Sequence, residues 1–120
     1  MRISHTRVEN CGRISLGTYC LHLHLVGHCT DCAFEGNAIV NGVNKGITVH
    51  GTHESLVDNN VLYRIKGASI YIEDGNELNN VISNNVCACP DYNECLLKGV
   101  PEHSDSDFNE QSAIYSLSPT

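Results

Sequence analysis

The chain has 120 residues, of which 41% are hydrophobic and 18% are charged, the composition of a single globular domain. Seven basic residues against 14 acidic ones give a formal net charge of -7, which is the wrong sign for binding nucleic acid or an anionic membrane surface. No apolar run approaches the roughly 20 residues that cross a bilayer. We therefore expect no nucleic-acid partner, and the chain as given shows no membrane segment and no export signal.

A short motif recurs along the chain, consisting of an apolar residue, a polar pair, Asn and further apolar residues. It occurs at residues 34–39, 57–62 and 82–87, and a fainter copy begins at Val8. The fourth residue of each copy serves as a marker, and the spacings between markers are 26, 23 and 25 residues. The markers are Cys11, Asn37, Asn60 and Asn85. A period near 25 residues is typical of a solenoid of repeated coils.

A second motif follows each of the first three markers by ten residues, at residues 21–25, 47–51 and 70–74. Apolar and polar residues alternate in all three copies, as in a half-buried strand. The intervening Gly and Asn turns leave no room for a ten-residue helix, which argues against leucine-rich and ankyrin arrays. The sequence therefore predicts an all-β fold, a right-handed parallel β-helix of about four coils, truncated at both ends.

Stacked coils place equivalent residues in columns, so the register can be predicted. The predicted inward columns are Leu21 with Ile47 and Ile70, Leu23 with Val49 and Ile72, and Val8 with Phe34, Val57 and Ile82. Side-chain amides at one bend bond along the stack and satisfy turn backbone groups that would otherwise lack partners. The amide ladder predicted at this bend is Asn37, Asn60 and Asn85.

The repeat breaks after Asn85, which predicts three segments: β-helix coils over 1–88, a long cysteine-rich and acidic loop over 89–111, and the start of a further coil over 112–120. The seven cysteines fit either an extracellular disulfide protein cut from something larger or a metal binder. The pairs Cys29-x-x-Cys32 and Cys87-x-Cys89 look like a four-thiolate zinc site, but the register separates them by roughly 10 Å. Local disulfides are favoured, including one between the Cys87/Cys89 pair and Cys95.

The outward positions of the second motif carry an unusual set of side chains. One column holds His22, Thr48 and Tyr71, and the next holds His24, His50 and Glu73. Two imidazoles and a carboxylate are a recurrent metal-binding or acid/base combination. Asp74 follows Glu73, and the two cooperate only if the strand ends at Gly75. Another interpretation is a plain solvated face, and no motif spacing fixes metal ligands, which stay unknown.

The motifs together resemble the parallel β-helix region of the fibrocystin-like proteins and of the cell-migration-inducing and transmembrane hyaluronidases. The resemblance covers about residues 3–86. It is carried by the runs 17–27, 37–39, 47–53, 56–61 and 73–80. It implies an extracellular or cell-surface parent protein and, in some members, calcium-dependent binding or depolymerisation of hyaluronan.

Two hypotheses follow for the function. In the first, the protein binds a polysaccharide such as hyaluronan and acts as a hyaluronidase-like glycosidase. The expected catalytic residues are then His24, His50, Glu73 and Asp74, the expected substrate-binding residues are His22, His53 and Tyr71, and calcium is the candidate cofactor. In the second, the protein is a non-enzymatic surface receptor or scaffold whose partner is a surface protein. A cytosolic zinc protein is a third, less favoured interpretation. The residues alone do not decide whether the chain is an enzyme.

Overall fold

The computed structural model describes residues 1–95 and 112–116, which form short strands and one 3-10 turn. In chain order these are β1 (Arg2–Ser4), β2 (Arg7–Glu9), β3 (Leu21–His28), β4 (Ala33–Glu35), β5 (Ala38–Val40), β6 (Ile47–His53), β7 (Leu56–Asp58), β8 (Val61–Tyr63), β9 (Ile70–Ile72), β10 (Val81–Ser83), β11 (Val86–Ala88), η1 (Tyr92–Glu94) and β12 (Ile114–Ser116). No helix in this described part of the chain is long and apolar enough to cross a membrane.

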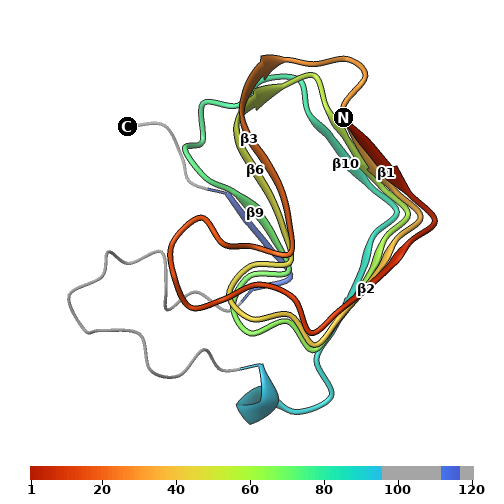
Figure 1. Ribbon diagram of the computed structural model, residues 1–120, viewed down its shortest axis with the longest axis vertical. Helices are drawn as coiled ribbons and strands as arrows, with labels where there is room; N and C mark the ends of the chain where they lie inside the picture. The colour runs from red at the N-terminus through yellow and green to blue at the C-terminus, as the bar shows by residue number, and fades with distance from the viewer. Residues whose placement is uncertain (96–111, 117–120) are drawn as a thin grey trace.

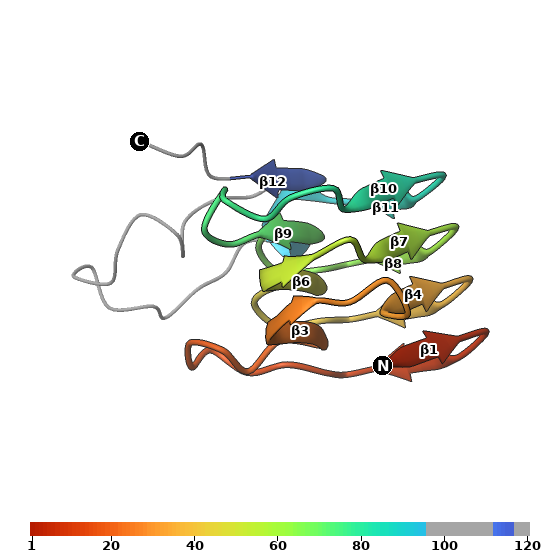
Figure 2. The ribbon, with the colours of Figure 1, turned by 90° about the horizontal axis from the view of Figure 1, so that it is seen from above.

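The strands form three parallel sheets, one on each side of a coil. Their strand orders are β1-β4-β7-β10, β2-β5-β8-β11 and β3-β6-β9-β12. In Figure 1 the chain runs clockwise from β1 through β2 to β3 as it recedes from the viewer, so the coils are right-handed. Figure 2 shows the coils stacked from β1 at one end to β12 at the other. The predicted right-handed parallel β-helix is confirmed.

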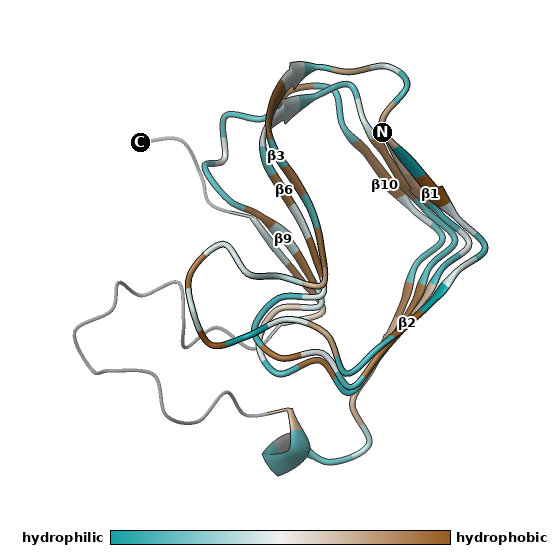
Figure 3. Cartoon of the chain, in the orientation of Figure 1, coloured by the Kyte–Doolittle hydropathy of each residue, from teal (hydrophilic) through white to brown (hydrophobic). Residues whose placement is uncertain are grey.

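The strand register confirms two of the predicted apolar columns. Leu21, Ile47 and Ile70 are paired across β3, β6 and β9, and so are Leu23, Val49 and Ile72. All six side chains are buried in one apolar core. Figure 3 shows the alternation of apolar and polar residues along these strands. The period of two in the sequence therefore places the intervening polar residues on the outer face of this sheet.

The prediction for the first coil was wrong in its register. Val8 lies in β2 and pairs with Ile39, whereas Ile3 is the partner of Phe34. The residue equivalent to Asn37 is Thr6, whose N–H donates to Asn37 Oδ1 across a separation of 31 residues. The error has a physical origin, because the first coil has a longer connection between its second and third strands, and the sequence after Val8 imitates the repeat motif.

The predicted Asn ladder is present at the corner between the first two sheets. Asn60 Oδ1 accepts hydrogen bonds from the backbone N–H and the side-chain amide of Asn37, at 2.9 and 3.0 Å. Asn85 Oδ1 accepts the same pair from Asn60, both at 2.9 Å. The amide of Asn60 also donates to the carbonyl of Phe34 at 2.9 Å. The ladder thus satisfies buried backbone groups at the corner.

The same corner contains a column of left-handed residues. The residue directly after each strand of the first sheet has a positive φ, and the four are His5, Gly36, Asn59 and Asn84, with φ of 53, 66, 56 and 52°. Each is followed by Thr6 or a ladder Asn and then by the next strand. Gly and Asn adopt this conformation at low cost, which explains their recurrence in the motif. Every described coil therefore turns this corner in two residues.

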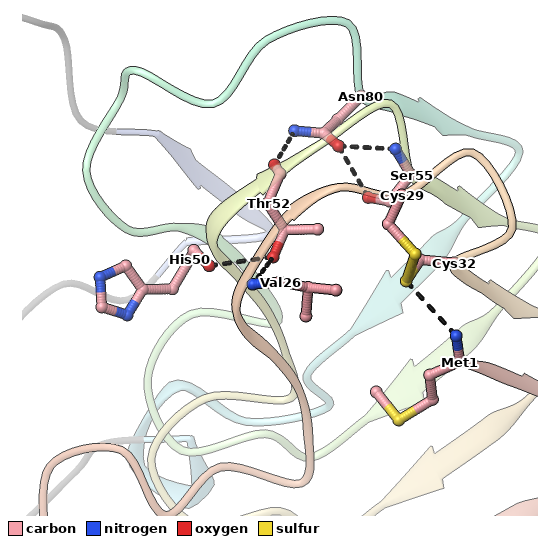
Figure 4. Close-up of a disulfide and its surroundings, with 8 residues drawn as sticks. All are labelled: Met1, Val26, Cys29, Cys32, His50, Thr52, Ser55 and Asn80. Atoms are coloured by element: carbon pink, nitrogen blue, oxygen red, sulfur yellow. Dashed lines mark hydrogen bonds between the residues drawn. A yellow bond between two sulfur atoms is a disulfide. The ribbon is translucent and has the colours of Figure 1, made fainter.

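Three disulfides close short loops in the described part of the chain. They join Cys11 to Cys20, Cys29 to Cys32 and Cys89 to Cys95. The bond to Cys95 is one of the two pairings that the sequence left open. Figure 4 shows the Cys29–Cys32 bond, with the amino group of Met1 3.5 Å from Cys32 Sγ. Because these sulfurs are oxidised, they do not form the four-thiolate zinc site that the spacing imitates.

The predicted division of the chain into three segments stays a prediction. The regular coils run to β11, and Ile114 of β12 pairs with Ile70 of β9. Residues 96–111 of the predicted loop and residues 117–120 lie outside the described residues. The boundaries at 88 and 111 remain predictions.

Cys87 is the one cysteine that the structure leaves out of a disulfide. Its thiol is half-buried, and burial raises its pKa. We expect one titratable thiol per chain in denaturant, and native alkylation on the order of tenfold slower than that of an exposed thiol, because the thiolate is the nucleophile. A thiol titration with Cys87→Ser as control checks this. Two or more thiols per unreduced chain would contradict the pairing.

Candidate functional site

Three histidines lie side by side on the outer face of the third sheet. His22 and His24 alternate with the buried Leu21 and Leu23 on β3, and His24 is the register partner of His50 on β6. Both strands are parallel and adjacent, so residues of the same register lie one rung apart. The sequence predicted this juxtaposition of His24 and His50, and the register shows it.

The imidazole rings of these histidines are in direct contact. His24 Nδ1 lies 3.1 Å from His50 Nδ1, and the two ring centroids are 4.8 Å apart. The ring of His22 is 4.9 Å from that of His24 and 6.2 Å from that of His50. One ring nitrogen from each residue lies within 4.8 Å of the other two. We call these three residues the histidine cluster.

A bulge ends the regular pairing just beyond His24. Leu25 has a positive φ of 50°, and the register of β3 against β6 shifts between His24 and Gly27. The side chain of Thr52 accepts a hydrogen bond from Val26 N–H at 3.2 Å and donates to the carbonyl of His50 at 3.0 Å (Figure 4). The bulge is therefore anchored by specific bonds, as is common where a strand aims side chains at a site.

Two carboxylates join the cluster from the end of β9. That strand ends at Ile72, earlier than the end at Gly75 that the sequence analysis made the condition for cooperation of Glu73 and Asp74. Glu73 Oε2 lies 3.7 Å from His22 Nε2 and 3.6 Å from His50 Nδ1. Asp74 Oδ2 lies 3.1 Å from His50 Nε2. Both carboxylates thus reach the same imidazole because the strand no longer forces them to opposite faces.

The outer nitrogens of two rings have acceptors that fix their tautomers. His22 Nδ1 lies 3.3 Å from the carbonyl oxygen of Gly17, and His50 Nε2 faces the carboxylate of Asp74. A carbonyl or carboxylate oxygen only accepts, so the proton of the neutral ring lies on these nitrogens. The lone pairs of His22 Nε2 and His50 Nδ1 then point toward the cluster. Burial lowers the pKa of His22, and its neighbours His24 and His50 lower it further.

Two of the predicted substrate-binding residues, His53 and Tyr71, lie outside the histidine cluster. His53 Nδ1 accepts a hydrogen bond from Leu78 N–H at 2.9 Å, and its ring packs 5.1 Å from that of His28, beyond the bulge. Tyr71 is only 1% exposed; its ring stacks on Tyr115 at 5.7 Å, with Lys45 Nζ 4.5 Å from its centre. His22 alone of the three predicted substrate contacts lies in the cluster. The role of each residue remains a prediction.

Sequence reasoning missed the residues that support the cluster. Tyr19 is 9% exposed and packs its ring 4.8 Å from that of His22. Glu77 Oε1 accepts hydrogen bonds from Gly51 N–H at 3.0 Å and Asp74 N–H at 3.1 Å, and so holds the turn after β9 against β6. Neither residue belongs to a repeat motif, and although both lie in runs that carry the family resemblance, nothing in the sequence assigned them to the site.

The donor set of this site does not match calcium. Calcium binds six to eight oxygen ligands. The polar atoms that converge here are imidazole nitrogens and the two carboxylates, and one carboxylate, Asp74, is already placed on a ring nitrogen. The calcium that the resemblance implied therefore does not fit these residues. Imidazoles with a carboxylate suit proton transfer or a transition metal.

Two cavities of the described part of the chain lie elsewhere. One, of about 350 Å³, is lined by residues that include Ser69, Cys87 and the Cys89–Cys95 disulfide. The other, of about 430 Å³, lies between Asn41 and Arg64. The histidine cluster lines neither of them. A ligand of the cluster would therefore approach it from the outer face of the sheet.

These features define a right-handed parallel β-helix that carries an imidazole–carboxylate cluster on one outer face. The sequence model of the family described as the CEMIP β-helix matches residues 1–116, and the chain belongs to this family. The resemblance noted in the sequence is confirmed.

Individual relatives span both branches of that resemblance. The chain is 37% identical over 98 residues to mouse Fibrocystin-L, covering 80% of this chain and 2% of the relative. It is 27% identical over 95 residues to the human cell surface hyaluronidase CEMIP2, and the match covers 72% of this chain and 7% of the relative. Communication mutant protein F of Dictyostelium discoideum is 36% identical to the chain over 89 residues, and the match covers 73% of this chain and 8% of the relative. The chain thus spans less than a tenth of these relatives, and no solved structure matches it.

Proposed function

We propose that the chain is a polysaccharide-binding β-helix module of an extracellular protein, and that hyaluronan is its first candidate ligand. The observation that carries the proposal is the convergence of His24, His50, Glu73 and Asp74 on one outer face. A relative of similar sequence is by its name a cell surface hyaluronidase. Three disulfides are typical of an oxidising, extracellular environment.

The geometry supports hydrolysis by acid–base chemistry. His24 is exposed, and its ring contacts that of His50, whose far nitrogen faces Asp74. In the proposed mechanism His24 or His50 donates a proton to the glycosidic oxygen as its bond to the sugar carbon breaks, and a water molecule attacks that carbon and gives up a proton. The neighbouring carboxylate of Glu73 or Asp74 stabilises the charged imidazole or acts as the partner base. No step depends on calcium, because the residues do not fit that ion.

The test is the size distribution of long hyaluronan incubated with the full chain, with and without calcium. We expect the polymer to shorten, and we expect His24→Ala/His50→Ala to abolish the shortening because it removes both candidate proton carriers. His28→Ala is the matched control, since His28 lies on β3 but beyond the bulge. Shortening that persists in the folded double variant would contradict the catalytic assignment, and shortening only with calcium would contradict the calcium-free mechanism.

A non-enzymatic scaffold is the second candidate function. The observation that favours it is the higher identity to Fibrocystin-L, 37% against 27% for the hyaluronidase. The net charge of -7 also opposes the approach of a polyanionic sugar. In this case folded protein leaves hyaluronan intact. Retention of the chain on immobilised hyaluronan without shortening would then indicate binding without catalysis.

A further inference from the structure

The histidine cluster brings imidazole nitrogens and a carboxylate oxygen together on one face. His22 Nε2 and His50 Nδ1 point their lone pairs toward the cluster, and Glu73 Oε2 lies 3.7 and 3.6 Å from these two nitrogens. His22 Nε2 is buried and has no hydrogen-bond partner in the described part of the chain. Such an arrangement of lone pairs is favourable when a positive ion lies between them.

Three of the distances between donor atoms are close to those of a small tetrahedral metal site. Zinc binds imidazole nitrogen at about 2.0 Å, so two ligands of a tetrahedral ion lie about 3.3 Å apart. The separations here are 3.1 Å between His24 and His50, 3.6 Å between His50 and Glu73, and 3.7 Å between His22 and Glu73. One nitrogen from each histidine lies within 4.8 Å of the others. Because some of these atoms are up to 4.8 Å apart, binding of one ion by all four groups requires side-chain rotation.

The outer partners of the rings also fit metal ligands. A ligating histidine usually donates its second N–H to a carboxylate or a backbone carbonyl, which fixes the ring and raises its basicity. His22 has the carbonyl of Gly17 in this position, and His50 has the carboxylate of Asp74. Both rings are therefore held with the correct nitrogen facing inward.

We propose that His22, His24 and His50 bind one divalent transition-metal ion of the zinc class, with Glu73 as the fourth ligand and Asp74 as the residue that orients His50. Three nitrogens and one carboxylate select such an ion over calcium. The proposal does not rest on polysaccharide binding, and it is an alternative to proton transfer by His50, because the ion and Asp74 then occupy both of its ring nitrogens. A bound cation would nevertheless lower the local negative charge on the face where the sugar is proposed to bind.

The test uses the full chain, stripped of metal by dialysis against a chelator and titrated with zinc in the absence of polysaccharide. We expect one zinc ion per chain, and Co²⁺ in its place should give the intense visible bands of a four-coordinate ion. His24→Ala should weaken zinc binding more than about 100-fold, since loss of an outer partner alone costs 10- to 100-fold. Asp74→Asn, which removes only an outer partner, should weaken zinc binding by about 10- to 100-fold.

The control is His28→Ala, which removes an exposed histidine beside His53 and Glu54, the other histidine–carboxylate group on these strands. Zinc binding should be unchanged in this variant. His24 is exposed, so its removal leaves the core intact, and circular dichroism verifies the fold. The absence of stoichiometric zinc, loss of zinc in His28→Ala, or displacement of zinc by a large excess of calcium overturns the proposal. If metal-free protein shortens hyaluronan, the proposed hydrolysis is supported and does not require the metal ion.

Discussion

Asn60→Ala is expected to lower the free energy of unfolding by about 3 to 5 kcal/mol. Asn60 is 1% exposed, and its side chain bonds to Asn37, to Asn85 and to the carbonyl of Phe34. The alanine leaves the N–H of Asn37 without a partner in a buried corner, which costs about 1 to 3 kcal/mol. The amide of Asn37 keeps its bond to the carbonyl of Ile3, and each of the lost side-chain bonds to Asn37, Asn85 and Phe34 costs about 0.5 to 1.5 kcal/mol. Equilibrium urea unfolding followed by circular dichroism measures the change.

Asn76→Ala is the matched control for this variant. Asn76 is exposed in the turn after β9 and takes no part in the ladder. Its substitution should change stability by less than about 0.5 kcal/mol. A loss below about 1 kcal/mol for Asn60→Ala would mean that water replaces the ladder bonds, contrary to the burial of this corner.

Gly12→Ala is expected to cost about 3 kcal/mol, the second large effect. Gly12 has φ of +77°, and a Cβ there would overlap the carbonyl oxygen of Val43. Val43 N–H donates to the carbonyl of Cys11 at 2.8 Å, so the backbone cannot move apart without weakening this bond between coils. The conformation costs about 1 to 2 kcal/mol and the overlap a similar amount. Thermal and urea unfolding give the value.

Gly17→Ala separates the two contributions. Gly17 has nearly the same φ, +76°, but a Cβ there meets nothing within 4 Å. This variant should therefore lose only the conformational part, about 1 kcal/mol. Equal losses for the two glycines would show that the contact with Val43 relaxes freely.

The repeat predicted most of the fold because its evidence is local and redundant. Alternation around Leu23, Val49 and Ile72 specifies which face is buried in three coils at once, and the Asn markers specify the corner. The predicted register of the first coil was wrong because this coil has Thr6 in place of Asn, and because the longer connection before Leu21 changed the spacing. A single copy that departs from the consensus has no second copy to correct it.

The site was predictable only where it follows from strand register. His24 next to His50 follows from pairing, and both carboxylates follow from the end of β9. The support of His22 by Gly17 and Tyr19 comes from an irregular connection, whose path depends on tertiary contacts that no periodicity describes. The separate environment of His53 arises from the bulge after His24, which alternation cannot predict because it breaks alternation.

The constant two-residue corner has a consequence for how this architecture diversifies. Equivalent corner residues are separated by 31, 23 and 25 positions, yet the three sheets stay in register. All variation in length among these coils is therefore absorbed on the other sides of the coil, between β2 and β3 and within or after β3, β6 and β9. An evolving or engineered chain is free to gain and lose connecting segments there without changing the core. New recognition surfaces can thus be grafted around a face whose chemistry is held fixed by the rungs beneath it.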